Sequence, residues 1–238
     1  MKATMKSFKM LVTQVSKDGI LLVVLFAPIL MGLLFKLGVP LGERIIANNL
    51  GKEDFFKDYY VLFDLMLAVM TPYMFCFVAS MTMLDEFDSN IINHLAITPI
   101  RKKGYLISRL IFPSIIAALA SLVILLIFSL NKWSFAMMII ICLLTSLMSI
   151  SVSLIVFSYS HNKVEGMAIA KLSGLVIIGM FIPYSIDNNI QYVFSILPSF
   201  WIAKFQMEPG IIFFLLSMIS SIIWIIVLYK RFIKKLSS

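Results

Sequence analysis

Six long apolar runs, each nearly free of charge, constrain this chain more than any other feature of its sequence. They cover residues 19–35, 59–84, 110–130, 135–159, 164–186 and 211–229. A membrane-spanning helix needs roughly 20 apolar residues, because the hydrocarbon core is about 30 Å thick and a helix rises about 1.5 Å per residue. A transmembrane barrel strand would instead alternate apolar and polar residues. The sequence therefore predicts an all-α integral membrane protein, with residues 1–238 forming a single transmembrane domain of six helices.

The overall composition excludes most soluble alternatives. Hydrophobic residues make up 61% of the chain and charged residues 13%, against about 45–50% and about 25% in ordinary soluble domains. A soluble fold of this size cannot bury that much apolar surface. The net charge of +8 does not indicate nucleic-acid binding, because no soluble segment is long enough to form a basic face. It fits attraction to anionic membrane lipid instead.

The distribution of basic residues predicts the orientation of the helices. Fourteen of the 20 lysines and arginines fall on the side that holds both termini and the segments 85–109 and 160–171. Because loops rich in Lys and Arg stay in the cytoplasm, we expect both termini to be cytoplasmic, in the plasma membrane of a bacterium. Residues 36–58 are then expected to form an outer loop.

The first 18 residues carry an amphipathic pattern. Met5, Phe8, Leu11 and Val15 recur at helical spacing, with lysines between them. This pattern predicts an interfacial helix on the inner leaflet. A frayed basic tail is the alternative.

The chain lacks the residue patterns of an enzyme. It has no G-x-x-x-x-G-K-[ST] loop and no Cys/His cluster with zinc spacing, so we expect no cofactor, no metal and no catalytic residue in it. Cys76 and Cys142 lie at depths that differ by roughly 15 Å, too far for a disulfide. Asp64, five residues inside the second run, is expected to reach the wet interface, and a proton or cation site is the alternative.

The segment between the second and third runs holds the most informative pattern. Phe87, Ile91 and Leu95 fall four residues apart, on one face of a helix that should end before Pro99. An acidic start precedes this stripe, and a basic cluster at 101–103 follows it. We expect a short cytoplasmic helix that transmits force from a soluble partner, within the loop 85–109.

An acid pair after the second span, a short amphipathic helix, Leu-x-x-Thr-Pro and a basic turn into the third span resemble the hallmark of ABC-2 type (type V exporter) permeases. In that family the segment is a coupling helix that docks into a separate ATP-binding subunit. The resemblance implies that the coupling residues are Asp85, Glu86, Asp88, Asn93, His94, Thr98 and Pro99. It also implies that ATP and Mg²⁺ are bound by the partner and not by this chain. Replacing Glu86 or His94 should then uncouple ATP hydrolysis from transport.

The segment 187–210 is too broken for a span and too apolar for an ordinary loop. Together with the end of the fifth run, it resembles the broken fifth span and the outer re-entrant helices of the same family. Backbone that dips into a membrane must pack on protein or line a cavity. We therefore expect an outer gate that contains Pro183, Pro198, Phe200 and Trp201, with an amphipathic loop on the outer leaflet as the alternative.

Two stripes mark the inside of the bundle. The second span carries flexible and aromatic side chains on one face, which suits varied apolar guests as well as plain packing: Phe63, Met66, Met70, Met74, Phe77 and Met81. The fourth span carries a small, weakly polar face of Cys142, Ser146, Ser149 and Ser153. We expect this second face to serve helix packing.

Together these patterns predict the permease subunit of an ATP-driven exporter, paired with an ATPase subunit and with a second permease copy or paralogue. Its expected cargo is amphipathic peptides, toxins or hydrophobic drugs, as in small exporters of Gram-positive bacteria. A stand-alone secondary carrier or channel is the main alternative, but it would need an intramembrane ion relay. A membrane-embedded lipid enzyme would need clustered acids or histidines at one leaflet, in a spacing that the sequence lacks.

Overall fold

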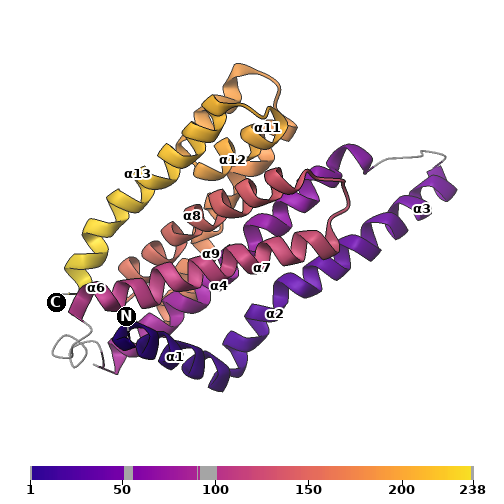
Figure 1. Cartoon of the computed structure of the whole chain (residues 1–238). Coiled ribbons are helices and arrows are strands. Elements are labelled where there is room, and N and C mark those ends of the chain that lie inside the picture. The colour runs from indigo at the N-terminus through magenta and orange to yellow at the C-terminus, as the bar shows by residue number, and fades with distance from the viewer. Residues whose placement is uncertain (1, 51–55, 90, 92–100, 237–238) are drawn as a thin grey trace.

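The computed structural model describes residues 2–50, 56–89, 91 and 101–236, and this part of the chain contains helices and no β-strand (Figure 1). The α-helices are α1 (Lys2–Lys17), α2 (Gly19–Leu33), α3 (Val39–Leu50), α4 (Tyr60–Asp88), α6 (Arg101–Leu106), α7 (Phe112–Phe128), α8 (Phe135–Tyr159), α9 (Lys163–Ser173), α10 (Leu175–Ile178), α11 (Ile182–Ser185), α12 (Pro198–Met207) and α13 (Ile211–Leu236). Five shorter segments are η1 (Leu34–Gly38) and η3 (Ile107–Ile111), which are π-helical, and η2 (Lys57–Tyr59), η4 (Gly179–Phe181) and η5 (Asn189–Ile196), which are 3₁₀.

Six helical stretches of the described chain are long and apolar enough to cross a membrane. They are Gly19–Asn48, Lys57–Asp88, Gly104–Phe128, Phe135–Tyr159, Lys163–Ser185 and Ile211–Leu236. The predicted all-α fold with six spans is thereby confirmed. In Figure 1 both chain ends lie at the lower left of the bundle, away from α11 and α12 at its top.

Helix α4 lies at the centre of the bundle, where it packs against α7, α8, α2 and α9. The hydroxyl of Ser121 on α7 donates to the Ala68 carbonyl at 3.2 Å, and that of Ser153 on α8 donates to the Cys76 carbonyl at 2.6 Å. Such small hydroxylated residues let helices approach closely and bond across the interface. The serine face of the fourth span therefore serves helix packing. Cys76 and Cys142 are both buried free thiols.

The first span is longer than the sequence predicted. Residues 36–50, expected in an outer loop, continue the helix through η1 and α3. The carboxylate of Glu43 on α3 accepts hydrogen bonds from the Phe56 amide, at 3.4 Å, and from the Tyr60 hydroxyl. These bonds tie the extended helix to the start of α4, which the charge pattern alone did not indicate.

Two other helices also continue beyond their apolar runs. The acidic residues 85–88 form the last turn of α4 and do not begin a separate helix. Helix α13 continues past the expected end at Tyr229 as far as Leu236. Its basic last turn stays helical because Lys235 donates to the carbonyls of Phe157, at 2.6 Å, and Ser160 at the end of α8.

Residues 2–17 form helix α1, which packs against α2, α4, α6 and η3. Its apolar face is buried at Leu11 and Val15, while Lys9 and Lys17 on the other faces are exposed. In Figure 1 α1 lies at the lower end of the bundle and joins α2 at a sharp bend. Its place in the plane of a membrane surface stays a prediction.

Candidate functional site

A fully buried ion pair lies at the end of the bundle that holds the chain termini. Arg109 on η3 pairs with Glu86 on α4 through two of its nitrogens: Nε donates to Oε2 at 3.0 Å, and Nη2 donates to Oε1. Neither side chain is exposed. The Tyr105 hydroxyl also donates to Glu86 Oε2 at 2.9 Å, and Arg109 Nη1 donates to the Ser7 carbonyl at 2.7 Å.

This ion pair connects three elements that are distant in sequence. Through Ser7, Tyr105 and Arg109 it joins α1 and the α6–η3 segment to the last turn of α4. Arg109 lies in a π-helical turn, a distortion that is often found at functional sites. The pair therefore holds the end of α4 next to the α6–η3 segment, and residues 89–100 connect these two elements in the sequence.

A second, partly exposed network surrounds Lys163 at the start of α9. Its ammonium group lies 2.7 Å from Asp18 Oδ2 and 2.8 Å from Asp85 Oδ2. Its backbone amide donates to Asp88 Oδ2 at 3.3 Å. Lys163 therefore connects the α1–α2 bend, the end of α4 and the start of α9.

Asp18 has a second role as the N-cap of α2. Its Oδ1 accepts from the amides of Ile20, at 3.0 Å, and Leu21, at 3.2 Å, groups that a helix start leaves without partners. The hydrogen bond from Lys163 lowers the pKa of Asp18 below its ordinary value, and the two amide bonds act in the same direction against the opposing effect of burial. The carboxylate is therefore held in its charged form.

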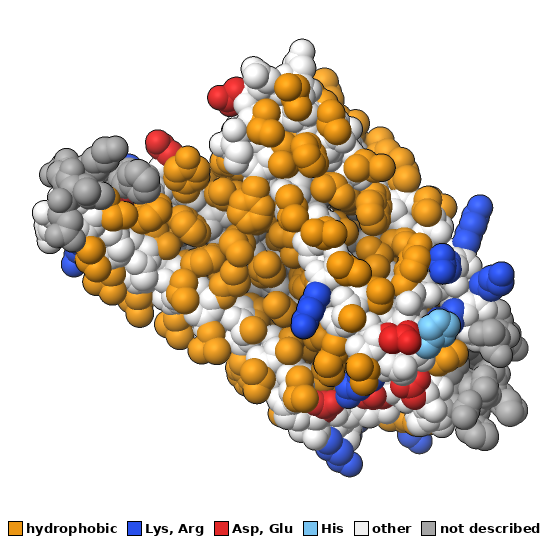
Figure 2. Space-filling view, turned by 180° about the vertical axis from the view of Figure 1, so that it is seen from behind, with side chains coloured by type: hydrophobic (Ala, Val, Ile, Leu, Met, Phe, Trp, Pro, Cys, Tyr) orange, Lys and Arg blue, Asp and Glu red, His pale blue; other side chains and the backbone are white. Residues whose placement is uncertain are grey.

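Aromatic contacts complete this end of the bundle. Phe87 on α4 packs edge-on against Phe157 on α8, with ring centroids 5.9 Å apart. The Lys235 ammonium lies 4.8 Å and 4.4 Å from the centroids of these two rings. Phe87, which we expected on the apolar stripe of a separate coupling helix, therefore belongs to the bundle. In Figure 2 most charged side chains gather at the lower right end, while the middle of that face is mostly hydrophobic apart from a basic side chain.

The structure separates the predicted coupling residues into three groups. Asp85 and Asp88 are at least partly exposed on the last turn of α4. Glu86 was expected on a docking surface, but its carboxylate is fully buried against Arg109. The others lie outside the described residues: Asn93, His94, Thr98 and Pro99.

Sequence reasoning missed the role of Arg109, which we had counted only among the basic residues of the expected cytoplasmic side. The signal was present, because Arg109 lies among Leu106, Ile107, Leu110 and Ile111. An arginine inside an apolar run needs an internal partner.

Asp64 also differs from the expectation. It is fully buried and therefore not exposed to water. Its carboxylate accepts three hydrogen bonds from the connection between α7 and α8: from the amides of Leu130, at 2.8 Å, and Asn131, at 3.0 Å, and from Trp133 Nε1, at 2.8 Å. Asp64 therefore holds the loop after the third span against α4.

The apolar stripe on α4 is only partly covered within the chain. Its members Phe63, Met66, Met70, Met74 and Phe77 are all half-buried. At one end the Phe63 ring lies 5.1 Å from the Phe35 ring of the first span. At the other end Met81 is fully buried beside Gly166 of α9. The stripe does not line the cavity between α1, α2, α4 and α7.

The outer segment folds into two short helices, η5 and α12. Pro183 and Pro198 lie in the first turns of α11 and α12, where a proline is tolerated because no helical bond is lost. Phe200 is fully buried, and Trp201 Nε1 donates to the Ser195 carbonyl at 2.7 Å. These helices pack on the end of the fifth span, and their entry into a membrane stays a prediction.

The close contact between α12 and the fifth span depends on one glycine. A Cβ atom added to Gly179 would lie 2.5 Å from Ser199 Oγ and 3.0 Å from the Phe200 backbone nitrogen. The predicted gate residues therefore lie on α11 and α12, which pack against each other at the end of the bundle opposite the chain termini (Figure 1).

The six apolar helices and the ion pairs at one end of the bundle define a multi-pass membrane protein. Comparison with known families gives a narrower assignment. The model of the family described as "Fluoroquinolones export permease protein Rv2686c-like" matches residues 12–229, and the chain belongs to this family. This membership agrees with the resemblance to ABC-2 type permeases.

Two curated relatives come from Mycobacterium tuberculosis. They are the fluoroquinolones export permease protein MT2760 of strain CDC 1551 / Oshkosh and the fluoroquinolones export permease protein Rv2686c of strain ATCC 25618 / H37Rv. Each is 24% identical to this chain over 193 residues, which cover 79% of this chain and 75% of the relative. No solved structure matches.

Proposed function

We propose that this chain is the membrane-spanning permease of an ATP-driven drug exporter in a bacterial plasma membrane, with both termini cytoplasmic. The observation that carries the proposal is the family match, which covers residues 12–229 and therefore all but the last part of the six spans. The excess of basic residues at the end with the termini supports the orientation.

The state of the buried acids favours an external energy source. A proton- or ion-driven carrier needs an intramembrane acid that is free to change partners. Asp64 is engaged by three donors, and Glu86 is engaged by Arg109 and Tyr105. We therefore favour a separate ATPase subunit that binds ATP and Mg²⁺ over a stand-alone carrier or channel.

Two exposed acids offer a docking surface for that subunit. Asp85 and Asp88 lie next to the segment whose sequence resembles a coupling helix and which contains Asn93, His94, Thr98 and Pro99. Glu86 has a different role in this proposal: with Arg109 it fixes the base of the segment to α1. Movement of the docked segment would then be passed to α1, α4 and η3 together.

We further propose that a second permease copy or a paralogue completes the exporter. The stripe of Phe63, Met66, Met70, Met74 and Phe77 is half-buried, although most other residues of α4 are covered by the chain. A flexible methionine surface suits varied apolar guests. The path for cargo would then run between the two halves, along this stripe.

Among the cargo classes that the sequence left open, we favour hydrophobic drugs over peptides and toxins. The support is that both relatives are named for fluoroquinolone export. Fluoroquinolones are flat and amphipathic, which is compatible with a Met-rich apolar wall.

An efflux assay tests the class and the energy source together. Cells that express this chain with its candidate ATPase are loaded with norfloxacin, which is fluorescent, and its loss is followed after washing. We expect efflux that stops when ATP is depleted and continues when the proton gradient alone is collapsed. Efflux that follows the proton gradient, or that proceeds without an ATPase, would support the secondary-carrier alternative.

A charge reversal tests the docking surface. We expect Asp88→Lys to weaken co-purification of the ATPase and to reduce efflux, because it places a positive charge on the proposed dock. Asp187→Lys, exposed at the opposite end of the bundle, is the matched control and should leave both unchanged. Equal effects of the two variants would remove the support for a dock at the end of α4.

A further inference from the structure

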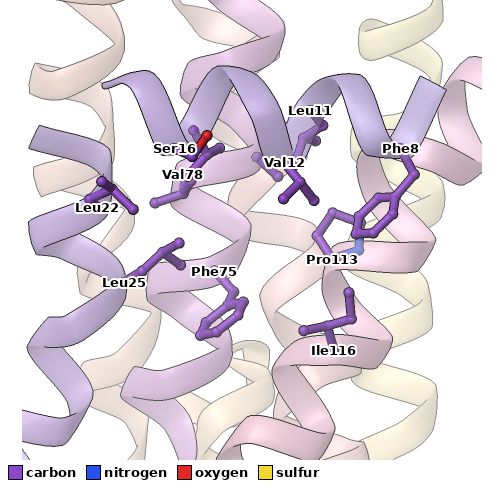
Figure 3. A pocket seen from close by; sticks show the side chains of 12 residues that line it. Phe8, Leu11, Val12, Ser16, Leu22, Leu25, Phe75, Val78, Pro113 and Ile116 are labelled. Carbon is purple, nitrogen blue, oxygen red and sulfur yellow. The ribbon is translucent and has the colours of Figure 1, made fainter. Parts of the chain in front are cut away.

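A cavity of about 190 Å³ lies beneath α1, between α1, α2, α4 and α7 (Figure 3). Figure 3 shows α1 crossing the other helices, with Val12, Leu25, Phe75, Pro113 and Ile116 around the open space. An engineered protein cavity of about 150 Å³ binds benzene. The cavity is therefore large enough for one ring or for part of an alkyl chain.

The lining of this α1 cavity offers almost nothing to a polar guest. Ser16 is the one polar residue among those that line it. Its hydroxyl already donates to the Thr13 carbonyl at 2.9 Å. A drug with carboxylate, ketone and amine groups would lose its hydrogen bonds to water there without replacement, whereas a hydrocarbon chain would lose none.

The cavity opens toward the apolar outer surface of the bundle. Its inner wall is buried, at Val78, Ala79 and Pro113, while Val12 and Ile116 at its rim are 48% and 38% exposed. Helices α2 and α7, which form two of its sides, carry exposed apolar side chains along their spans. In a membrane these surfaces contact lipid, so the nearest available guest is a lipid acyl chain.

A positive charge lies beside the rim. Lys9 shares one side of α1 with Val12 and Ser16, three and seven residues further on, and it is exposed. Helix α1 contains four lysines and no acidic residue. An ammonium group next to an apolar opening at the membrane surface matches an anionic head group above its acyl chain.

We propose that the α1 cavity binds one acyl chain of an anionic phospholipid, whose head group is held at Lys9. The bound chain fills the space between α1 and the ends of α2, α4 and α7. Because α1 is also bonded to Arg109 through Ser7, the lipid supports the same helix that the Glu86–Arg109 pair holds. This site is separate from the proposed cargo path on α4.

Photolabelling tests the location. The full chain is placed in nanodiscs with phosphatidylglycerol that carries a diazirine near the middle of one acyl chain, and the labelled residues are mapped by mass spectrometry. We expect labelling of the cavity lining several-fold above that of Ile222 and Ile226, which are exposed on α13. Uniform labelling of all exposed apolar surfaces would overturn the proposal.

Two filling variants show whether the cavity itself is responsible. Ala79→Phe fills it from the inner wall, and Val12→Phe narrows it from the half-exposed rim, where a larger side chain disturbs packing least. We expect both to reduce labelling of the cavity several-fold and to leave labelling of α13 unchanged. Unchanged cavity labelling in Val12→Phe, a variant that should fold, would contradict the proposal even if Ala79→Phe failed to fold.

A charge comparison tests the head group. We expect the phosphatidylglycerol probe to label the cavity several-fold more than a phosphatidylcholine probe with the same chain. Lys9→Gln should remove that preference. Lys17→Gln should retain it, because Lys17 lies about 140° around α1 from Val12 at the rim. Equal labelling by both lipids, or displacement of the label by norfloxacin, would instead assign the cavity to uncharged lipid or to drug and would overturn the proposal.

Discussion

Removing the charge of Glu86 should weaken the fold strongly. Glu86→Gln keeps the size of the side chain, but it leaves the Arg109 guanidinium buried with neutral acceptors such as the Ser7 carbonyl. Breaking a buried ion pair by removing one partner costs about 3–5 kcal/mol. We therefore expect Glu86→Gln to lower the free energy of unfolding by about 3–5 kcal/mol. The double variant Glu86→Leu with Arg109→Met removes both charges, and because apolar replacement of a whole pair is often neutral, it should recover most of the loss.

Unfolding by sodium dodecyl sulfate in mixed micelles, followed by circular dichroism, measures these differences. Asp88→Asn is the matched control, because its carboxylate lies on the same turn of α4 but is exposed. Exposed pairs contribute only about 0–1 kcal/mol, so this control should stay within that limit. The interpretation of the pair as a structural clamp is wrong if Glu86→Gln destabilises the chain no more than Asp88→Asn does.

Three further changes test other parts of the structure. Asp64→Ala leaves three partly buried donors without their acceptor, and a hydrogen bond contributes about 0.5–1.5 kcal/mol net, so the free energy of unfolding in detergent should fall by about 1–4 kcal/mol. The stability of Asp64→Asn should lie between those of the wild type and Asp64→Ala, and this variant should retain the proposed efflux; loss of efflux in folded Asp64→Asn would indicate an ion-coupling role. Because the bond from Lys163 lowers the pKa of Asp18, the contribution of this pair to stability is present above the ordinary pKa of 3.8 and is lost as the pH falls through the lowered folded value. The difference in melting temperature between the wild type and Lys163→Met should therefore shrink progressively below about pH 4, and a difference that does not shrink at all as the pH is lowered would contradict this pairing. Gly179→Ala should destabilise the chain by about 1–3 kcal/mol through overpacking. Gly19→Ala is the control and should not destabilise it, because a Cβ added there meets nothing within 4 Å. Equal melting temperatures of the two variants would refute the close contact at Gly179.

Much of the fold could be predicted from the sequence, because nearly every residue of a membrane-spanning helix must be apolar to cross the hydrocarbon core. Helix α8 covers the same residues as its apolar run, since Ser134 and Ser160 interrupt the hydrophobic pattern at both ends. The break in the fifth span and the two short outer helices were also indicated, because Pro183 and Pro198 restrict where helices begin.

The remainder depended on contacts between distant residues. Glu86 and Arg109 are 23 residues apart. Glu86 lies in an acidic turn that is typical of a surface, so its local pattern did not indicate a buried partner. Asp64 is held by backbone amides of a loop 66 and 67 residues away, and amides carry no sequence signal. Helix ends were misplaced wherever such a contact keeps a polar turn helical, as at Lys235.

Transport in inside-out vesicles tests the proposed function most directly. Vesicles that contain this chain and the proposed ATPase subunit are given norfloxacin outside, and its accumulation inside is measured after ATP is added. We expect accumulation that requires ATP, the ATPase subunit and this chain together, and that is reduced by Asp88→Lys. Accumulation driven by a pH gradient in vesicles that contain this chain alone would contradict the assignment as the permease of an ATP-driven exporter.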